Sequence, residues 1–419
     1  MGVVGIICEY NPLHLGHERM LRTLRQQGAE AIVCAMSGNF VQRGEPAVVG
    51  KMARAEMALR CGADLVLEIP TPWSAATAET FARGGVEILR RTGVVDELAF
   101  GAECPDVEAL EAVAAALDGE EYREALRRHE AGNITFAARR QAAVAELSGP
   151  DRAALLEKPN NILAVEYLRC LRGTSMRPVA IPRQGAGHDE ESAEDGTASA
   201  SQIRQLLHAG RIEQALAYMP DEAARVLRRE MERGFAPASL DRCERSVLDR
   251  LRRMEEEDWA RYDGGGEGLC HRMYRAAREA TDLQSLLERA KTKRYPLARL
   301  RRMMLSAWLE LPAPPEQVPY LRLLGANDTG RRLLRQMKNV PVLTKPADVA
   351  GLGNEAAVLF RQECRWSDLY ALTCPRVNPC GEDWRSVPVL LSGEGKGYDH
   401  EKNADIARAS GAGAGDRGL

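Results

Sequence analysis

The first two hundred residues alternate short apolar runs with longer amphipathic segments. This alternation predicts buried strands separated by helices. The predicted strands are Val3–Cys8, Ala31–Met36, Asp64–Ile69, Glu97–Phe100 and Pro178–Ile181, and the helices between the first four are Glu18–Gln27, Lys51–Cys61 and Ala75–Arg91. Such an order indicates βαβ units and a parallel sheet covered on both faces. Ligands of such sheets bind at the carboxyl ends of the strands.

The rest of the chain has a different pattern. Residues 106–147 are rich in Ala, Leu, Arg and Glu, which predicts inserted helices, and Asn160–Leu171 predicts another helix. Residues 183–195 are rich in Gly and acidic residues and predict a mobile loop, closed by a helix that begins near Ser201. Beyond it almost every segment has helical spacing, with breaks at Pro220, Gly264–Gly266 and Pro312–Pro315.

These patterns predict an α/β fold in which a domain with a parallel sheet precedes a mainly α-helical C-terminal domain. We place the first domain at residues 1–208 and the helical one at residues 209–392. Residues 393–419 are rich in Gly, Ala and charge and predict a disordered tail.

Composition narrows the class of protein. The chain has 419 residues, a formal net charge of −3 and 45% hydrophobic residues, as expected of a globular protein of two or three domains. The apolar run at the N-terminus meets Glu9 too early for a signal sequence, and no stretch approaches the ~20 apolar residues that span a bilayer. The 10 Cys are scattered singly, which favours a reducing cytoplasmic location.

Charge is distributed unevenly along the chain. Residues 1–204 carry a net charge of −7 and residues 205–345 a net charge of +7. Arg289–Lys345 alone holds 13 basic and 3 acidic residues, with Tyr295, Trp308 and Tyr320 among them. A basic segment with interleaved aromatics indicates a polyanion partner, whereas the alternative is a solvated helical face. Its attachment to a nucleotide-handling domain favours the polyanion.

That domain is indicated by two histidines directly after the first predicted strand. His14 and His17 lie one turn apart at the start of a helix, where backbone N–H groups and the helix dipole attract anions. Two imidazoles there can bond phosphate oxygens in a phosphoryl-transfer transition state, and Gly16 leaves room for a nucleotide. The alternatives are a metal site, for which no third ligand is indicated, and histidines that pack in the core or cap the helix.

The motif also carries a family resemblance. His14-Leu15-Gly16-His17 is similar to the HxGH signature of the nucleotidyltransferase superfamily. The wider text of residues 5–17 and 36–46 resembles the bacterial tRNA(Met) cytidine acetate ligases. The resemblance continues at residues 51–56, 62–68, 100–103, 159–164, 199–204 and 292–295, with Ser201 where the family pattern usually has Thr.

The resemblance implies a Rossmann-like nucleotidyltransferase domain and a two-step ligase. Acetate and ATP would give acetyl-adenylate, and the acetyl group would pass to the wobble cytidine of elongator tRNA(Met), forming N4-acetylcytidine. ATP and acetate are then substrates, Mg²⁺ is expected with ATP, and no resident metal is expected. The helical, basic domain of residues 209–392 would bind the tRNA.

The candidate residues follow from motif and position. The expected catalytic residues are His14, His17, Ser199 and Arg204. The expected nucleotide-binding residues are Ile7, Glu9, Tyr10, Asn11, Pro12, Leu13, His14, Gly16, His17, Met20, Gly101, Asn160, Asn161, Arg183 and Ser201. The expected nucleic-acid contacts are Lys293, Arg294, Arg299, Arg301 and Arg302. Several have plainer interpretations: Gly101 as a turn, Asn160 or Asn161 as a helix cap, Arg183 as an exposed loop residue, and Ser199 and Ser201 as caps.

Two other functions stay open. A small-molecule adenylyltransferase of the same superfamily would explain the first domain but leaves the basic segment unused. A catalytically silent RNA-binding or nucleotide-sensing protein would not need two histidines together with Ser199 and Arg204. For Cys364, Cys374 and Cys380, buried thiols are favoured over a zinc site, because no CxxC pair is present. The oligomeric state is not predicted.

Overall fold

The computed structural model describes residues 1–129, 135–183, 198–263, 268–338 and 340–392. Of the expected loop of residues 183–195, only Arg183 is therefore described, and the break at Gly264–Gly266 and the tail of residues 393–419 lie outside the described residues. Within the described part of the chain, no helix has the length and apolarity needed to cross a membrane.

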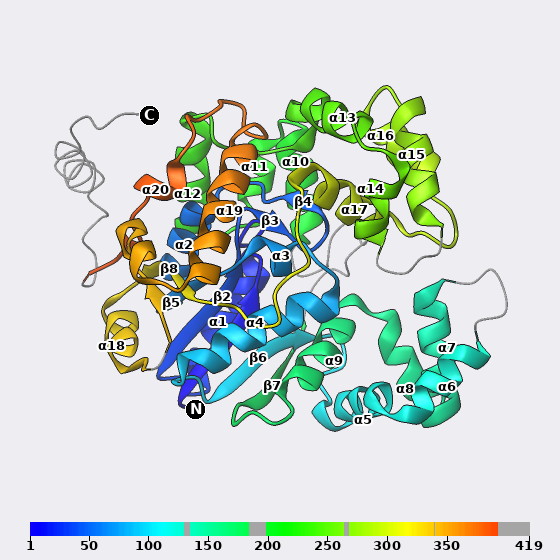
Figure 1. Cartoon of the computed structure of the whole chain (residues 1–419). Coiled ribbons are helices and arrows are strands. Elements are labelled where there is room, and N and C mark those ends of the chain that lie inside the picture. The colour runs from blue at the N-terminus through cyan, green and yellow to red at the C-terminus, as the bar shows by residue number, and fades with distance from the viewer. Residues whose placement is uncertain (130–134, 184–197, 264–267, 339, 393–419) are drawn as a thin grey trace.

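An eight-stranded sheet lies at the centre of the structure (Figure 1). Its strand order is β10-β8-β5-β2-β1-β6-β7, and β9 pairs with β8. The strands are β1 (Val3–Cys8), β2 (Ala31–Ser37), β5 (Leu65–Ile69), β6 (Glu97–Ala102), β7 (Arg177–Pro182), β8 (Leu321–Ala326), β9 (Val342–Leu343) and β10 (Val389–Leu390). The five strands from the first half of the chain are parallel, as predicted, and β8 joins β5 in antiparallel register.

Helices cover both faces of this sheet. One face packs against α1 (Leu15–Gln26), α2 (Lys51–Arg60), α10 (Ala200–His208), α11 (Ile212–Leu216) and α12 (Asp221–Glu232). The other packs against α3 (Thr71–Ser74), α4 (Ala78–Thr92) and α9 (Pro159–Leu171). Because both faces are covered, every residue of β2 and β5 is buried, which explains why those strands appear in the sequence as unbroken apolar runs.

Two helical groups flank the sheet at the right of Figure 1. The lower group is the inserted helices, α5 (Val107–Asp118), α6 (Glu120–Arg128), α7 (Phe136–Ser148) and α8 (Pro150–Ala154), of which α5 packs on α9. The upper group is α13 (Glu244–Arg252), α14 (Glu256–Asp263), α15 (Leu269–Glu279), α16 (Leu283–Ala290) and α17 (Leu297–Leu309). On the opposite side lie α18 (Asp328–Gln336), α19 (Asn354–Ala371) and α20 (Glu382–Arg385), and 3-10 turns occupy Leu155–Glu157, Leu240–Cys243 and Pro346–Gly351.

The expectation that nearly everything after residue 201 is helical is wrong in one respect. β8 and β10 lie in the central sheet, with Leu65 beside Ala326 and Gly325 beside Val389. The C-terminal half therefore completes the sheet begun by the N-terminal half. The boundary placed at residue 208 stays a prediction.

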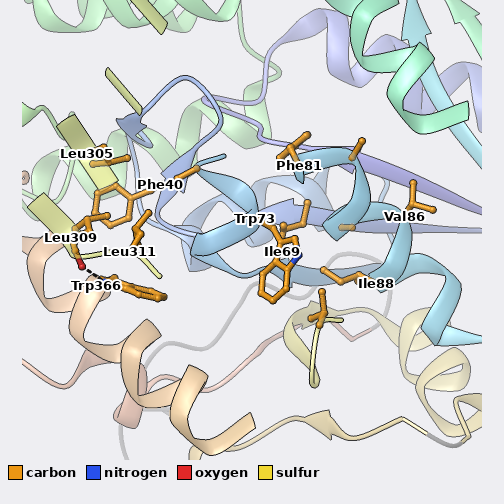
Figure 2. Close-up of a cluster of buried hydrophobic side chains, with 14 of the residues drawn as sticks. Phe40, Ile69, Trp73, Phe81, Val86, Ile88, Leu305, Leu309, Leu311 and Trp366 are labelled. Carbon is orange, nitrogen blue, oxygen red and sulfur yellow. Dashed lines mark hydrogen bonds between the residues drawn. The ribbon is translucent and has the colours of Figure 1, made fainter. Parts of the chain in front are cut away.

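A short antiparallel hairpin, β3 (Phe40–Val41) and β4 (Glu45–Pro46), connects the sheet with the C-terminal helices. The Phe40 ring lies edge-on to the rings of Trp308 and Tyr370, at centroid distances of 6.3 and 5.9 Å. Figure 2 shows Phe40 beside Leu305 and Leu309 of α17, where the indole N–H of Trp366 donates to the Leu309 carbonyl at 2.8 Å. The hairpin is thus packed into a core shared by both halves of the chain.

A buried ionic network ties the C-terminal elements to the sheet. Lys51 Nζ lies 2.8 Å from Glu68 Oε1 and 2.9 Å from Asp383 Oδ2. Arg322 Nη1 lies 3.2 Å from Glu68 Oε2, and its Nη2 lies 3.1 Å from Asp383 Oδ1. All four side chains are less than 8% exposed. Although burial alone raises it, Arg322 and Lys51 hold the pKa of Asp383 well below its usual range.

Removing one charge of this network should destabilise the fold. Asp383→Asn leaves two buried cations sharing one carboxylate, so we expect the free energy of unfolding to fall by about 3–5 kcal/mol. Urea unfolding at neutral pH measures the change, with Glu213→Gln, which breaks an exposed pair with Arg228, as the control without a measurable effect. A loss of stability equal to that of the control would contradict a stabilising role for the network.

Candidate active site

The candidate site lies at the carboxyl edge of the sheet, where β1 ends. In the sheet β1 has β2 on one side and β6 on the other, so the order of the strands reverses at β1. Such a point, where the strand order reverses, is where open α/β sheets bind ligands. Arg54 of α2, fully buried, holds this edge by donating to the carbonyls of Glu9 at 2.6 Å and Ser37 at 3.1 Å.

The two histidines of the motif form a reciprocal cap at the start of α1. The Gly16 N–H donates to His14 Nδ1 at 3.1 Å, and the His14 N–H donates to His17 Nδ1 at 3.4 Å. The two rings lie 3.8 Å apart between centroids. The capping interpretation therefore holds. It also fixes the chemistry, because an Nδ1 that accepts a hydrogen bond leaves the ring proton on Nε2, where it is free to be donated.

Both imidazoles are held neutral. Burial lowers the pKa of His14 to about 3, and the positive charges of Arg183 and Arg204 act in the same direction. Burial, then His14 and Arg183, also lowers the pKa of His17 well below its usual value. Neutral Nε2–H groups beside two arginines can bond the oxygens of an anionic group without first being charged.

Arg204 is oriented by the turn that precedes α1. Its Nη1 donates to the Asn11 carbonyl at 2.9 Å, and its Nη2 lies 3.6 Å from Glu45 Oε2. Asn11 Oδ1 accepts from the Val48 N–H at 2.7 Å, and Glu9 Oε1 accepts from the Gln42 N–H at 2.8 Å. The side chains of Asn11 and Glu9 thus hold the turn and the hairpin in place.

Other residues predicted to contact nucleotide also support the turn. The side chains of Tyr10 and Leu13 are at most 2% exposed and belong to the core under α1, and Pro12 is buried with them. Ile7 packs against α4, where a side chain on Gly85 would collide with it. Met20 is half-buried against the same core as Tyr10. These contacts are structural, and a role in nucleotide binding stays a prediction for each.

A second part of the site comes from the ends of β6 and β7. Arg183 Nη1 donates to Asn160 Oδ1 at 2.9 Å, and Asn160 Nδ2 donates to Glu103 Oε1 at 2.6 Å. A Cβ on Gly101 would lie 3.2 Å from Arg183 Cγ, so this glycine lets the arginine cross the strand end. Asn161 is buried, and its Oδ1 accepts from the Cys104 N–H at 3.0 Å. Of the two asparagines, Asn160 is therefore the one whose amide stands beside Arg183.

The start of α10 adds polar groups from a third segment. Ser199 is its N-cap and accepts from the Gln202 N–H at 3.2 Å, as the capping interpretation predicts. Ser201, half-buried, lies in the first turn, one turn before Arg204. The structure thus brings Ser199 and Arg204 onto one helix, and Arg204 contacts the turn that carries His14.

The basic segment divides into buried and exposed parts. Tyr295, Trp308 and Tyr320 are at most 6% exposed, so the idea that these aromatics interleave with cations on a surface is wrong. Their rings belong to the hydrophobic core and cannot stack on bases. Arg322 belongs to the buried ionic network. Lys293 and Arg294 are exposed.

The remaining three predicted nucleic-acid contacts, Arg299, Arg301 and Arg302, are partly buried, and the last two contact the hairpin. Arg301 Nη1 lies 2.5 Å from Glu45 Oε1, and Arg302 Nη1 donates to the Gln42 carbonyl at 3.4 Å. Burial, then Arg299 and Arg43, lowers the pKa of Arg302 to about 10. Arg43 and Glu45 lie within the text that carries the family resemblance, but no individual role is predicted for them, because nothing in the local sequence places the hairpin between α10 and α17.

Among the described residues, no group of three or more His, Cys, Asp or Glu side chains is placed to hold a metal ion. Glu9, which follows β1 directly, accepts the Gln42 N–H with its carboxylate. Cys364 and Cys374 are buried as predicted, whereas Cys380 is exposed.

Paired neutral histidines at a helix start, beside arginines at the switch point of a parallel sheet, define a nucleotidyltransferase site of the HIGH type. The family model described as HIGH Nucleotidyl Transferase matches residues 1–383. A tRNA(Met) cytidine acetate ligase of Caldanaerobacter subterraneus subsp. tengcongensis is 34% identical over 385 residues, 89% of this chain and 95% of the relative. Another, of Fervidobacterium nodosum, is 36% identical over 358 residues, 82% of this chain and 84% of the relative.

Solved structures agree with these sequence relatives. Thermotoga maritima TmcAL bound with alpha-thio ATP has a TM-score of 0.87 and 30% identity, covering 94% of this chain and 100% of that one. Its apo form has a TM-score of 0.89 and 31% identity, with the same coverage. The chain belongs to the HIGH nucleotidyltransferase family and, within it, to the tRNA(Met) cytidine acetate ligases.

The depressed pKa of His14 predicts a pH-dependent stability. The folded state keeps the imidazole neutral down to a pKa of about 3, whereas the unfolded chain binds a proton near pH 6.5. The stability of the folded state is therefore not reduced by His14 above pH 6.5. Below pH 6.5 the proton taken up by the unfolded chain lowers the free energy of unfolding progressively as the pH falls toward about 3. His14→Asn keeps an N-capping side chain but removes the titrating imidazole. The slope of the free energy of unfolding against pH should therefore be smaller in this variant than in wild type, by up to about 1.4 kcal/mol per pH unit.

Urea unfolding between about pH 4 and pH 6.5 measures this difference. His271→Asn, at an exposed position on α15, controls for the loss of an imidazole elsewhere. Equal pH slopes in wild type and His14→Asn would show that His14 is not held neutral by the fold.

Proposed function

We propose that this protein is an ATP-dependent ligase that activates acetate as acetyl-adenylate and transfers the acetyl group to the wobble cytidine of elongator tRNA(Met). The observation that carries the proposal is the His14 and His17 pair, with both Nδ1 atoms used in the cap and both Nε2 atoms left to donate, beside Arg204. The identity of the substrates is inferred from the family, because the relatives at 34% and 36% identity are tRNA(Met) cytidine acetate ligases.

In the first step a carboxylate oxygen of acetate attacks the α-phosphorus of ATP. The bond from this phosphorus to the bridging oxygen breaks, and pyrophosphate leaves with that electron pair. Such transfer depends mainly on positioning and charge stabilisation. The Nε2–H groups of His14 and His17 would bond the phosphate oxygens, and Arg204, with Ser199 at the start of α10, would face the leaving pyrophosphate. Arg183 and Asn160 would hold the nucleoside or its phosphate from the other side.

In the second step the N4 amine of cytidine attacks the carbonyl carbon of acetyl-adenylate. The bond from this carbon to the phosphate oxygen breaks, AMP leaves, and the amine loses a proton. The cytidine must reach the same edge of the sheet, since the acetyl group stays attached to AMP until transfer. Flipping of the base from the anticodon loop would bring it there.

The tRNA would approach over α17 and the segment before it. Lys293 and Arg294 are exposed, and Arg299, Arg301 and Arg302 continue the positive surface toward the hairpin. Phosphate contacts of this kind provide affinity without reading sequence. A cytoplasmic location, where tRNA is modified, and Mg²⁺ bound with ATP belong to the same proposal.

One assay tests both the reaction and the site. The protein is incubated with ATP, labelled acetate and unmodified elongator tRNA(Met), and the digested RNA is analysed for N4-acetylcytidine by mass spectrometry. We expect the product with wild type and a loss of about 10²–10³-fold in rate for His14→Ala, since a transition-state hydrogen bond is removed. AMP formation without acetylcytidine would instead favour the small-molecule adenylyltransferase.

The proposed tRNA surface makes a separate prediction. Replacing both Lys293 and Arg294 by Ala should raise KM for tRNA by about tenfold and make binding less sensitive to salt, because two phosphate contacts are lost. Arg90→Ala, which removes an exposed cation of α4, serves as the control. The same salt dependence in the double variant and the control would exclude these two residues from the interface.

A further inference from the structure

Glu45, which has no part in the bond changes of the proposed reaction, lies between the nucleotide site and the proposed tRNA surface. Its Oε2 lies 3.6 Å from Nη2 of Arg204 on α10, and its Oε1 lies 2.5 Å from Nη1 of Arg301 on α17. Arg204 is 14% exposed and Glu45 24%, so water screens their interaction only partly. One carboxylate is thus shared by an arginine of the nucleotide site and an arginine of the proposed tRNA surface.

The hairpin that carries Glu45 is fixed against both parts. Gly44 has a φ of 76°, and a Cβ there would lie 2.5 Å from the Arg302 backbone nitrogen, so the turn is in direct backbone contact with α17. Gln42 contacts both sides, since its N–H donates to Glu9 and its carbonyl accepts from Arg302. A displacement of α17 would therefore move the hairpin, and with it Glu45.

Charge makes the carboxylate important for the geometry of Arg204. Burial lowers the pKa of Arg204, Glu45 and Glu9 oppose this effect, and Arg43 and Arg301 add to it. Without the carboxylate, like charges would push the Arg204 guanidinium away from its bond with the Asn11 carbonyl.

We propose that Glu45 is a positioning residue that orients Arg204 toward the phosphates and, through Arg301, couples this orientation to occupation of α17 by the RNA backbone. The inference rests on the proposed function. A phosphate bound to Arg301 would compete for that guanidinium and leave the carboxylate to Arg204. Docked RNA would then strengthen the contact that holds Arg204 at the nucleotide site.

A double-mutant cycle tests the positioning role. The maximal rate of pyrophosphate release from ATP and acetate is measured for wild type, Glu45→Gln, Arg204→Ala and the double variant, with Glu87→Gln, which removes a charge paired with Arg90 on α4, as the matched control. We expect a loss of about tenfold for Glu45→Gln and none for Glu87→Gln. The double variant should be no slower than Arg204→Ala, because Glu45 acts through Arg204. Glu45→Asp, which keeps the charge, should recover part of the rate.

The coupling has its own readout, the KM for ATP with and without saturating tRNA. In wild type the two values should differ, and in Glu45→Gln they should be equal. Additive losses in the cycle would overturn the positioning role, and equal values in wild type would overturn the coupling. If wild type forms no acetylcytidine at all, the proposed function fails, a result distinct from either of these.

Discussion

The first turn of α1 is closed by the same two side chains that face the candidate site. Because Nδ1 of His14 and of His17 each accept a backbone N–H, the ring protons stand on Nε2 and the imidazoles stay neutral among arginines. An aspartate would cap the helix as well, but would leave no donor turned toward an anion. Capping and phosphate binding are therefore a single arrangement, and the turn that presents His14 must be held rigidly for either to work.

Distant segments supply that rigidity. Arg54 binds the carbonyls where β1 and β2 end, Arg204 of α10 binds the Asn11 carbonyl, and the hairpin binds the Glu9 carboxylate through Gln42. Each of these contacts joins a polar backbone group or a carboxylate to a partner in a region from which water is largely excluded, where an unpaired group is costly. The site is thus maintained by the fold as a whole, and little of it depends on α1 alone.

The features that could be predicted from the sequence are those that a local pattern of residues determines. Val3–Cys8 and Ala31–Met36 are continuous apolar runs, so their strands were found, and the spacing of His14 and His17 follows from one helical turn. β8 was missed because its pairing with β5 depends on residues far away in the chain, and its short run lies among prolines and arginines. The same limit applies to Tyr295: the sequence shows an aromatic among cations, but only the folded structure shows that the ring lies in the core.

The buried ionic network connects the C-terminal half of the chain to the hairpin beside the candidate site. Asn39, which begins the hairpin, accepts the Lys51 N–H at 2.9 Å and donates to Ser367 Oγ at 3.2 Å, and that hydroxyl donates to Asp383 Oδ2 at 2.7 Å. The base of the hairpin is therefore attached to α19 and α20, while its tip contacts α17. A buried ion pair is weak evidence for stability alone, because a hydrophobic replacement would often serve as well. Here the network orients Asn39 through the Ser367 hydroxyl, by hydrogen bonds that apolar residues cannot make. The C-terminal half thereby holds the hairpin, and with it Glu45, in its position beside Arg204.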